Sequence, residues 1–272
     1  MNKDKKVSDN GIAKMERDEE DRHGSATERA LAILLQVANS EEPIAATHIA
    51  SRLAVPVPTV HRLVRHLEEL GYLERVLGSK RLSIGAMLQK MALAALINSD
   101  IRGHRHSALK SLVDIVKETC NITVLDGSEV TYIDRVESQW PLRTHLHPGS
   151  RVPIHCGASG KVFLAHMPAY RRRRLLYSAP LRQMTDKTVT DPALIENELD
   201  EVRRQGYAVD DEEFLKGLIG LAVPIFGPSN RVCATVSMHS PTIRHSAKTI
   251  QQYIPMLQHT ALSLKETLVW ID

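Results

Sequence analysis

The chain has 272 residues, of which 43% are hydrophobic and 25% are charged, and its formal net charge is +3. This composition is typical of soluble globular proteins with one or two domains and a real core. The sequence has no run long and apolar enough for a membrane helix, and its charged start lacks the apolar stretch of a secretory signal. The three cysteines are widely spaced, which fits neither a disulfide framework nor a CxxC zinc site. We therefore expect a cytoplasmic protein with reduced thiols and no membrane contact.

Residues 1–24 mix both charge signs and hold few large apolar side chains. Such a segment cannot bury enough surface to offset its conformational entropy, so we predict a disordered tail. The net charge of the whole chain is too small to indicate a nucleic-acid-binding protein by itself. DNA binding has to be judged from where the basic residues lie.

Residues 25–84 carry the pattern of a winged helix-turn-helix domain. Ser25 and Glu28 have the spacing of a capping box, which predicts that a helix starts there. A short helix is expected over residues 47–53, and a third over VPTVHRLVRHLEELG with Pro58 in its first turn. The stretch YLERVLGSKRLSI then predicts two short strands around a turn, which would form the wing.

The apolar faces of the two longer helices are expected to form the core of this domain, because side chains spaced three and four apart share one helix face. In the first helix these residues are Ala30, Leu31, Leu34, Leu35, Val37 and Ala38. In the third helix they are Val60, Leu63, Val64, Leu67 and Leu70.

The opposite face of the third helix is the candidate DNA-reading surface. No carboxylate occurs between Val57 and Leu67, and two arginines lie one turn apart. Such a helix can place its first side chains on base edges in the major groove while neighbouring groups hold phosphates. A surface with merely solvated charges remains the alternative on these residues alone. The predicted DNA-binding residues are Pro58, Thr59, His61, Arg62 and Arg65 on the helix, and Arg75, Lys80 and Arg81 around the wing.

Residues 85–102 predict a linker helix with a broad apolar face, which Gly103 is expected to break. That face is too wide for a free surface helix. Packing against a second copy in a dimer is attractive, because helix-turn-helix proteins usually read paired half-sites. Packing within the same chain remains open.

Residues 103–272 alternate helices and strands, which predicts an α+β domain with an antiparallel sheet. Helices are expected over 107–120, 159–166 and 247–269, and over a segment that ends at Gly206. The expected strands are NITVLDG, EVTYIDRVE, PLRTHLHPGS and a pair within GLAVPIFGPSNRVCATVSMHS, with a turn at residues 227–230.

The stretch HCGASGK at residues 155–161 is the most distinctive motif of this domain. A glycine-rich turn ahead of a helix presents successive backbone amides and the positive end of the helix dipole to an anion. A nucleophile elbow needs Gly-x-Ser-x-Gly, and the run from Gly157 to Gly160 is one residue too short. Carboxylate binding is therefore favoured over hydrolysis, while a plain helix start without a ligand stays open.

Other clusters are weaker candidates for chemistry. His145 and His147 share a strand face and could bind zinc with His155, although no carboxylate partner is evident. Adjacent side chains such as His155 and Cys156 point to opposite faces of an extended segment, which argues against a Cys/His pair. The run Arg171–Arg174 is typical of a solvated helix face. We predict no metal and no cofactor.

Four stretches taken together resemble the IclR family of bacterial transcription regulators: PTVHRLVRHLEELGYL, GSRVPIHCGASGKVFLA, QGYAVDDEEFLKGLIGLAVPIFG and ATVSMHSP. The likeness runs from Ser25 to the C-terminus. It implies a winged helix-turn-helix domain, a linker helix and a GAF-like effector domain with an antiparallel sheet. It also implies a homodimer or tetramer that binds double-stranded operator DNA and changes state with a small carboxylate effector. The wing departs from the family pattern, since KRLSIG lacks the usual tyrosine.

The resemblance also indicates the effector-binding positions, which are Ala158, Ser159, Asp210, Gly220, Ser237 and His239. Regulators that respond to glyoxylate and pyruvate have a cysteine in place of Gly220 and a serine in place of His239. We therefore expect a pocket that is wider at Gly220 and more basic at His239, with aromatic acids among the candidate ligands. Asp210 would either accept a hydrogen bond from a ligand hydroxyl or hold loop amides.

The sequence thus predicts a cytoplasmic, ligand-responsive regulator of a catabolic operon rather than an enzyme. Two alternatives are an enzyme acting on a small carboxylic acid and a DNA-binding protein without an effector. The expected division is a tail at 1–24, a winged domain at 25–84, a linker helix at 85–102 and an effector-binding and oligomerisation domain at 103–272. Activation and repression are equally compatible with these residues.

Overall fold

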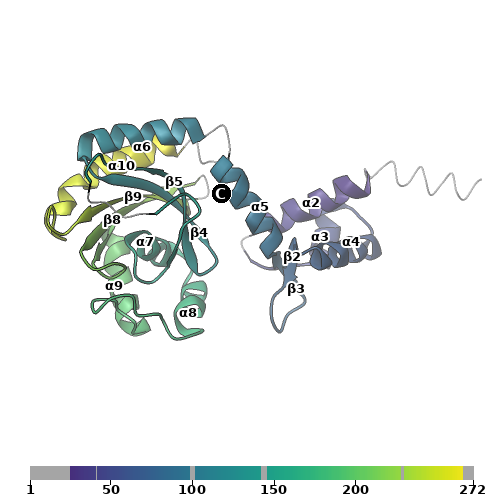
Figure 1. Ribbon diagram of the computed structural model, residues 1–272. Coiled ribbons are helices and arrows are strands. Elements are labelled where there is room, and N and C mark those ends of the chain that lie inside the picture. Colours follow the sequence, from purple (N-terminus) through teal and green to yellow (C-terminus); the bar gives the residue numbers. More distant parts are fainter. Residues whose placement is uncertain (1–24, 41, 99–101, 142–145, 228–229, 266–272) are drawn as a thin grey trace, which may run out of the picture. The chain divides into compact units, whose positions relative to one another are not determined.

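The computed structural model describes residues 25–40, 42–98, 102–141, 146–227 and 230–265 (Figure 1). The predicted tail lies outside the described residues. The chain divides into two compact units between Leu93 and Ala94, a boundary inside helix α5 (Ala86–Asn98). Among the described helices, none is long and apolar enough to cross a membrane.

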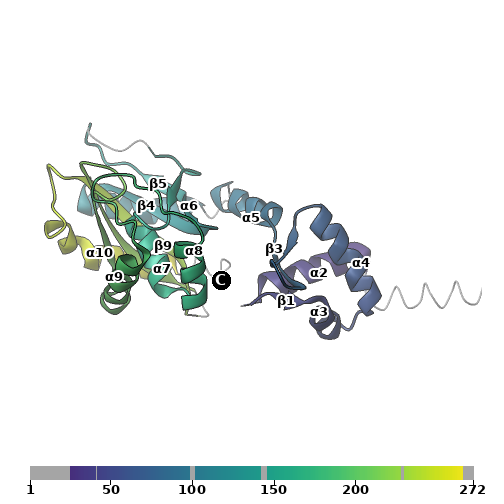
Figure 2. The same cartoon turned by 90° about the horizontal axis from the view of Figure 1, so that it is seen from below.

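The first unit contains three helices and a small antiparallel sheet with the strand order β1-β3-β2. Figure 2 shows α2, α3 and α4 next to strands β1 and β3. The elements are α2 (Ala26–Ala38), β1 (Ile44–Ala45), α3 (Ala46–Leu53), α4 (Val57–Glu69), β2 (Leu73–Arg75) and β3 (Arg81–Ile84). This is a winged helix-turn-helix unit, and β1 is a strand that the sequence did not predict.

The ends of these helices follow from local chemistry. Ser25 caps α2, because its hydroxyl accepts from the Glu28 amide while the Glu28 carboxylate accepts from the Ser25 amide. Pro58 lies in the first turn of α4, where its missing N–H leaves no helical bond unmade. The predicted capping box is confirmed.

The core of the first unit is formed by one face of each helix. On α4, Val60, Leu63, Val64 and Leu67 are buried as predicted, whereas Leu70 at the C-cap is exposed. The expected face of α2 was partly wrong, because Leu31 and Leu35 are 55% and 61% exposed. The buried residues of α2 are Ile33 and Val37, which lie one turn apart.

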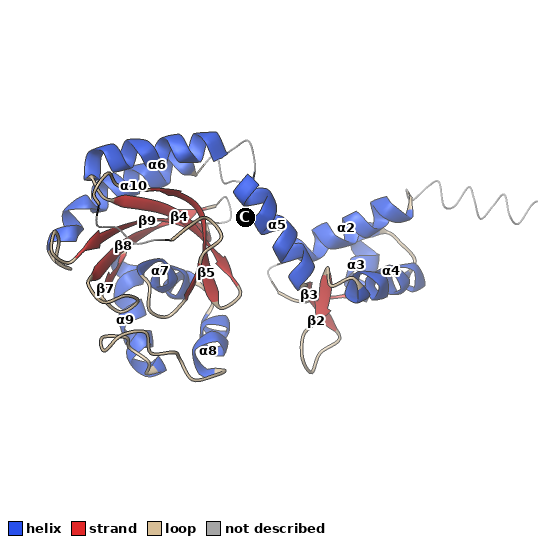
Figure 3. Ribbon diagram, in the orientation of Figure 1, coloured by secondary structure: helices blue, strands red, loops and turns tan. Residues whose placement is uncertain are grey.

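The second unit is built on a six-stranded antiparallel sheet with the strand order β6-β5-β4-β9-β8-β7 (Figure 3). Its strands are β4 (Thr119–Asp126), β5 (Glu129–Val136), β6 (Arg151–Pro153), β7 (Ala208–Asp211), β8 (Leu218–Phe226) and β9 (Val232–Pro241). Its helices are α6 (Arg102–Val116), α7 (Ala158–His166), α8 (Ala169–Tyr177), α9 (Pro192–Gln205) and α10 (Ile254–Leu264), with the 3₁₀ helix η1 (Thr249–Tyr253). The predicted α+β class is confirmed.

Two layers of helices cover the two faces of this sheet. Helices α6 and α10 lie on one face, while α7, α8 and α9 lie on the other (Figures 1 and 3). Helix α7 packs on the sheet itself, against β7, β8 and β9. Side chains that alternate along each strand therefore face either α6 and α10 or α7.

Several predicted boundaries in this unit need correction. Gly103 lies inside the first turn of α6 and does not itself break a helix. The helix expected over 107–120 ends at Val116, because Lys117 takes a left-handed backbone conformation with φ of +60°. Strand β4 then begins at Thr119, two residues before the predicted strand.

The last helix is also divided. Pro255 cannot donate a backbone hydrogen bond and would clash with the preceding turn of a continuous α-helix. The chain therefore forms η1 before it and α10 from Ile254 onward. The strand expected in PLRTHLHPGS and the turn at 227–230 lie partly outside the described residues; the short strand found nearby is β6. Strand β7, over AVDD, was not predicted.

Candidate DNA-binding surface and effector site

Helix α4 presents its predicted DNA-reading residues on the side away from the core. Pro58, His61, Arg62 and Arg65 are exposed, and Thr59 is half-buried. Neither Arg62 nor Arg65 forms an ion pair with any residue that the structure describes. Their guanidinium groups are therefore available to an external polyanion.

The wing residues differ from one another in their internal partners. Arg75 donates to both carboxylate oxygens of Glu68 on α4, from Nε at 2.7 Å and from Nη2 at 3.0 Å, and also to the Lys80 carbonyl. Arg81 donates to the Pro43 carbonyl at 3.3 Å. Lys80 is exposed and has no ion pair within the described part of the chain. Lys80 is thus the wing cation that can reach a phosphate without breaking an internal contact.

The tip of the wing carries a residue that the sequence prediction passed over. Leu77 is 95% exposed in the turn between β2 and β3. An apolar side chain this exposed gains nothing for the fold, and nothing in its sequence context marked it for attention.

In the second unit, helix α7 begins at the predicted glycine-rich turn. Its N-cap is Gly157, so no side chain satisfies the first helical amides. A Cβ atom at Gly160 would lie 1.9 Å from the Ile154 carbonyl oxygen, so only glycine allows this close packing. Because Gly157 provides no side-chain cap, the amides of Ala158 and Ser159 lie at an uncapped helix start, which is the positive end of the helix dipole.

Gly220 lies beside three other predicted effector residues. A Cβ atom there would be 3.3 Å from the Asp210 Cβ and from the His239 Cδ2, and 3.6 Å from the Ala158 Cβ. Strand pairing explains this proximity, because Gly220 lies opposite Asp210 on β7 and opposite His239 on β9. The structure brings these four positions together.

The other two predicted residues join this group through β9. Thr235 donates to the Ser159 hydroxyl at 2.9 Å and pairs with the Thr123 hydroxyl at 2.6 Å. Ser237 is two residues further along the same strand, so it points to the same side of the sheet. Its hydroxyl is buried and has no hydrogen-bond partner among the described residues.

A second chain of hydrogen bonds crosses the same face. Arg135 donates to the Asn121 side-chain oxygen at 2.8 Å, and the Asn121 amide lies 3.4 Å from His239 Nδ1. An arginine can only donate, so the Asn121 atom facing it is the oxygen. The Asn121 NH₂ group therefore donates to His239 Nδ1, which leaves Nε2 carrying the ring proton.

We call the buried polar side chains on this face the polar row. They share burial and one side of the sheet, and they are Asn121, Thr123, Arg135, Thr235, Ser237 and His239.

His239 itself corrects one expectation. Burial, together with the charge of Arg135, lowers the pKa of His239 to about 3. The ring is neutral near pH 7 and supplies a hydrogen-bond donor, not a positive charge. The basic group at this end of the polar row is Arg135.

Asp210 holds the loop that follows β7. Its Oδ1 atom accepts from the amides of Glu213 at 2.7 Å and Phe214 at 3.3 Å. Burial, reinforced by the charge of Glu213, raises the pKa of Asp210 to about 7. Of the two roles considered for Asp210, the structure shows contacts of the loop-holding kind.

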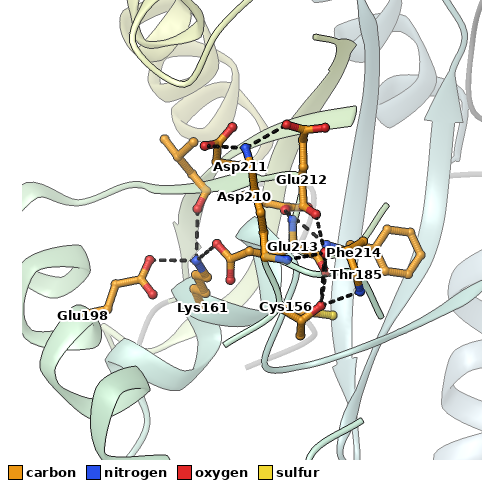
Figure 4. Close-up of polar contacts among 12 residues, drawn as sticks. Cys156, Lys161, Thr185, Glu198, Asp210, Asp211, Glu212, Glu213 and Phe214 are labelled. Carbon is orange, nitrogen blue, oxygen red and sulfur yellow. Dashed lines mark hydrogen bonds and ion pairs between the residues drawn. The ribbon is translucent and has the colours of Figure 1, made fainter. Parts of the chain in front are cut away.

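Lys161 links this loop to two helices, as Figure 4 shows. It is 1% exposed, and its ammonium group contacts the Glu213 carboxylate, the Glu198 carboxylate at 2.7 Å and the Val209 carbonyl at 3.3 Å. Burial alone would lower the pKa of Lys161, but the two carboxylates raise it above the usual value. The lysine of the GASGK motif thus ties α7 to α9 and to the β7–β8 loop.

Several residues of this site were missed at the sequence level. A usable signal existed in the strands, because Asn121 and Thr123 alternate with buried Cys120 and Ile122. Such alternation in a fully buried strand marks a polar side of a sheet. Arg135 and Lys161 gave no such signal, since their partners come from distant segments.

The residues considered for catalysis are occupied otherwise. His155 donates to the Arg182 carbonyl at 2.9 Å, and burial lowers its pKa. Burial raises the pKa of the Cys156 thiol to about 12, so it is not a ready nucleophile. Within the described residues, no three His, Cys, Asp or Glu side chains gather as a metal site, and His145 lies outside them.

A winged helix-turn-helix unit, followed in one chain by a domain with buried polar residues beneath a helix start, defines a ligand-responsive DNA-binding regulator. Two family models match the chain: the IclR helix-turn-helix domain at residues 26–77, and the bacterial transcriptional regulator IclR C-terminal domain at residues 93–266. The chain therefore belongs to the IclR family of bacterial transcriptional regulators and is not an enzyme. The predicted family and the predicted role as a ligand-responsive DNA-binding regulator are confirmed.

Individual relatives agree with this assignment. The chain is 37% identical over 243 residues to the probable transcriptional regulator SauR of Cupriavidus necator, which covers 89% of this chain and 96% of SauR. The crystal structure of Thermotoga maritima IclR matches with a TM-score of 0.60 at 28% identity, over 89% of this chain and 98% of that one. An IclR homologue from Microbacterium hydrocarbonoxydans, complexed with 4-hydroxybenzoate, matches with a TM-score of 0.57 at 26% identity, over 90% and 99%.

Proposed function

We propose that the effector of this regulator is a small carboxylic acid, with aromatic acids as the first candidates, bound between the start of α7 and the polar row. The observation that carries this proposal is the Ser237 hydroxyl, which is buried without a partner in the described structure. A buried hydroxyl without a hydrogen bond is costly, and a ligand atom would remove that cost.

The charges of the site support an anionic ligand. The α7 start offers uncapped amides around Ala158 and Ser159, and Arg135, whose Nε also lies 3.5 Å from the Glu137 carboxylate, is a permanent cation at the polar row. Neutral His239 offers an Nε2–H group to a hydroxyl or carbonyl oxygen. Gly220 leaves space where a side chain would meet Asp210 and His239. The homologue complexed with 4-hydroxybenzoate makes an aromatic acid a reasonable first choice.

The DNA side of the proposal assigns reading to α4 and phosphate contact to the wing. Arg62 and Arg65, with Pro58, Thr59 and His61, would contact base edges and the adjoining backbone. Lys80 would hold a phosphate directly, and Arg75 and Arg81 would do so in exchange for their internal partners.

We also propose a homo-oligomer that works in the cytoplasm. Helix α5 is apolar, yet Met87 and Met91 are exposed, and among its side chains from Ala86 to Ile97 only Leu96 is buried. Pairing with α5 of a second copy would cover this surface and present two reading helices to a symmetric operator.

In this scheme residues 25–84 bind DNA, residues 85–102 link the domains and oligomerise, and residues 103–272 bind the effector. Sedimentation of Met87→Glu with Met91→Glu should give monomers if α5 forms the dimer.

The effector proposal is tested with a panel of aliphatic and aromatic carboxylic acids and the full-length protein. At least one acid should raise the melting temperature, because a ligand of the native state stabilises it. Ser237→Ala should weaken that shift, and Asp210→Ala should abolish it. Thr131→Val is the matched control, since Thr131 also has a buried hydroxyl without a described partner but lies on the opposite side of the sheet. Stabilisation by no acid at all would overturn the proposal.

The DNA assignment is tested by titrating duplex DNA from upstream of the regulator's own gene at several salt concentrations. Arg62→Ala with Arg65→Ala should lower both the affinity and the slope of its logarithm against salt. Unchanged values would contradict the assignment to α4. An acid that stabilises the protein should also change operator affinity, and the operator should change acid affinity by the same factor.

A further inference from the structure

Helix α8 presents an unusual charged surface on the effector unit. It contains the consecutive residues Arg171, Arg172, Arg173 and Arg174, and its only fully buried side chain is Leu176. Helical spacing turns Leu176 and Arg172 toward the body of the domain. The other three arginines are exposed. We call Arg171, Arg173 and Arg174 the α8 arginine face.

This face is only partly neutralised by the rest of the unit. Glu196 of α9 lies 3.8 Å from Arg172 and 3.5 Å from Arg173. Arg171 and Arg174 form no ion pair with any described residue. The sequence around them offers no acid either, because residues 138–185 contain neither Asp nor Glu. Adjacent like charges repel one another, so the fold gains nothing from this arrangement.

Two tyrosines border the arginine face. Tyr170 and Tyr177 are 59% and 55% exposed, and they are seven residues apart, so they share a side of the helix with Arg174. Tyrosine hydroxyls and guanidinium groups are both common donors to phosphate oxygens.

We propose that the α8 arginine face is a second DNA contact, which binds backbone phosphates of duplex outside the stretch read by α4 and recognises no base. Charge complementarity identifies this occupant. All three cations of the face are arginines, whose planar fork matches a phosphate in a bidentate fashion, and the chain belongs to a class that binds DNA. Exposed tyrosines and arginines are also common in protein interfaces, so an acidic protein is the rival occupant that the test has to exclude.

The test measures binding of the full-length protein to a fluorescent duplex of unrelated sequence over a range of potassium chloride. Arg171→Gln with Arg174→Gln should lower the slope of log affinity against log salt by about 2, the value for two lost phosphate contacts. Arg171→Lys with Arg174→Lys should keep most of the slope, because the charge remains. The matched control is Lys110→Gln with Lys248→Gln, which removes two exposed cations from α6 and the start of η1.

The outcomes separate this proposal from its rivals. The proposal is overturned if Arg171→Gln with Arg174→Gln has the same slope as the wild type. It is also overturned if that slope equals the slope of the control that carries Lys110→Gln and Lys248→Gln. The same pair of changes should still lower the slope in a chain that also carries Arg62→Ala and Arg65→Ala, since α4 is a separate contact. Labelled polyglutamate is titrated in parallel. Loss of polyglutamate binding with an unchanged duplex slope would assign the face to an acidic protein and reject the DNA contact.

Discussion

The two faces of the effector sheet are built by the same strands and carry opposite chemistry. On β9, Val236 and Met238 lie on the face covered by α6 and α10, while Thr235, Ser237 and His239 lie on the α7 face. All five are buried. Apolar residues on both faces would stabilise the fold at least as well, because buried polar groups have to recover their desolvation cost through hydrogen bonds. The polar face is therefore better explained by binding than by folding.

The buried polar groups of this face do not all recover their desolvation cost through hydrogen bonds. Arg135, Asn121 and His239 satisfy one another, and Thr235 satisfies Ser159. Ser237 is left over. A preorganised set of hydrogen bonds that leaves the Ser237 hydroxyl and the His239 Nε2–H group open is what a specific ligand site requires.

The largest effect is expected from Lys161→Met. Loss of the ammonium group leaves the carboxylates of Glu213 and Glu198 facing each other without a cation at the base of α7. Breaking a buried ion pair by removing one partner costs about 3–5 kcal/mol. We expect a loss of this order in the free energy of unfolding, measured by urea denaturation.

Lys187→Met is the matched control. Lys187 also contacts two carboxylates, Asp211 and Glu212, but half of its side chain is exposed. Exposed pairs contribute far less than buried ones, because water screens the charges. Equal losses in the two variants would show that the buried polar connections on the α7 side have no special energetic weight.

Substitutions on β9 compare the two faces directly. Met238→Ala should destabilise by about 2–5 kcal/mol, because it opens a cavity in the apolar layer. Ser237→Ala should change stability by less than about 0.5 kcal/mol or increase it slightly, because it removes a hydroxyl that lacks a partner. Denaturation without ligand measures both. A large loss in Ser237→Ala would mean that its hydroxyl already has a structural role.

The sequence predicted the apolar layer and the elements better than the polar connections. Spacing of three and four located α4 and its core face, and the glycine-rich turn located the start of α7 within one residue. These signals are local, since they depend on neighbours within one turn. The resemblance to known regulators supplied Asp210, Gly220, Ser237 and His239, and pairing of β7, β8 and β9 brings them together.

The contacts of Arg135 and Lys161 could not be predicted in this way. Lys161 meets Glu198 and Glu213, which are 37 and 52 residues away, and only the packing of α7 against α9 and β7 brings them close. The neutral state of His239 likewise depends on burial and on Arg135. The C-terminal end of α6 and the start of α10 also differ from the prediction. Lys117 has a positive φ, which ends α6, and Pro255 lacks the N–H group that a continuous last helix would need.

A third prediction uses the pH dependence of stability. The pKa of Asp210 is raised from its ordinary value of 3.8 to about 7 in the native state. Between these values the native protein holds a proton that the unfolded chain has released, so stability falls as pH rises from about 4 to about 7. Asp210→Asn has no such proton and keeps an oxygen for the amides of Glu213 and Phe214.

Unfolding free energies of the wild type and of Asp210→Asn, measured from pH 5 to pH 8.5, therefore should diverge. Below pH 7 the wild type should lose up to ~1.4 kcal/mol of stability per pH unit relative to the variant. Above pH 7 the difference between the two proteins should stay constant. A difference independent of pH would show that Asp210 is ionised throughout and that this part of the polar face is better solvated than its burial indicates.

A smaller loss of stability than in Lys161→Met or Met238→Ala is expected from Gly220→Ala, which tests whether the space beside Asp210, His239 and Ala158 matters for binding rather than for folding. The new methyl group would lie 3.3 Å from Asp210 and His239 and 3.6 Å from Ala158, so neighbours would have to move by a few tenths of an ångström. Stability should fall by about 1 kcal/mol, a typical value for mild overpacking.

The midpoint of the acid-dependent thermal shift should move to higher acid concentration by a larger factor than the stability loss explains, because the methyl group occupies volume that the ligand would use. The control is Ala234→Val, because Ala234 is buried on β9 and shares the face of Val236 and Met238, away from the site. If Gly220→Ala leaves the acid response unchanged, the ligand does not lie against β8 and the site has to be moved toward β4 and Arg135.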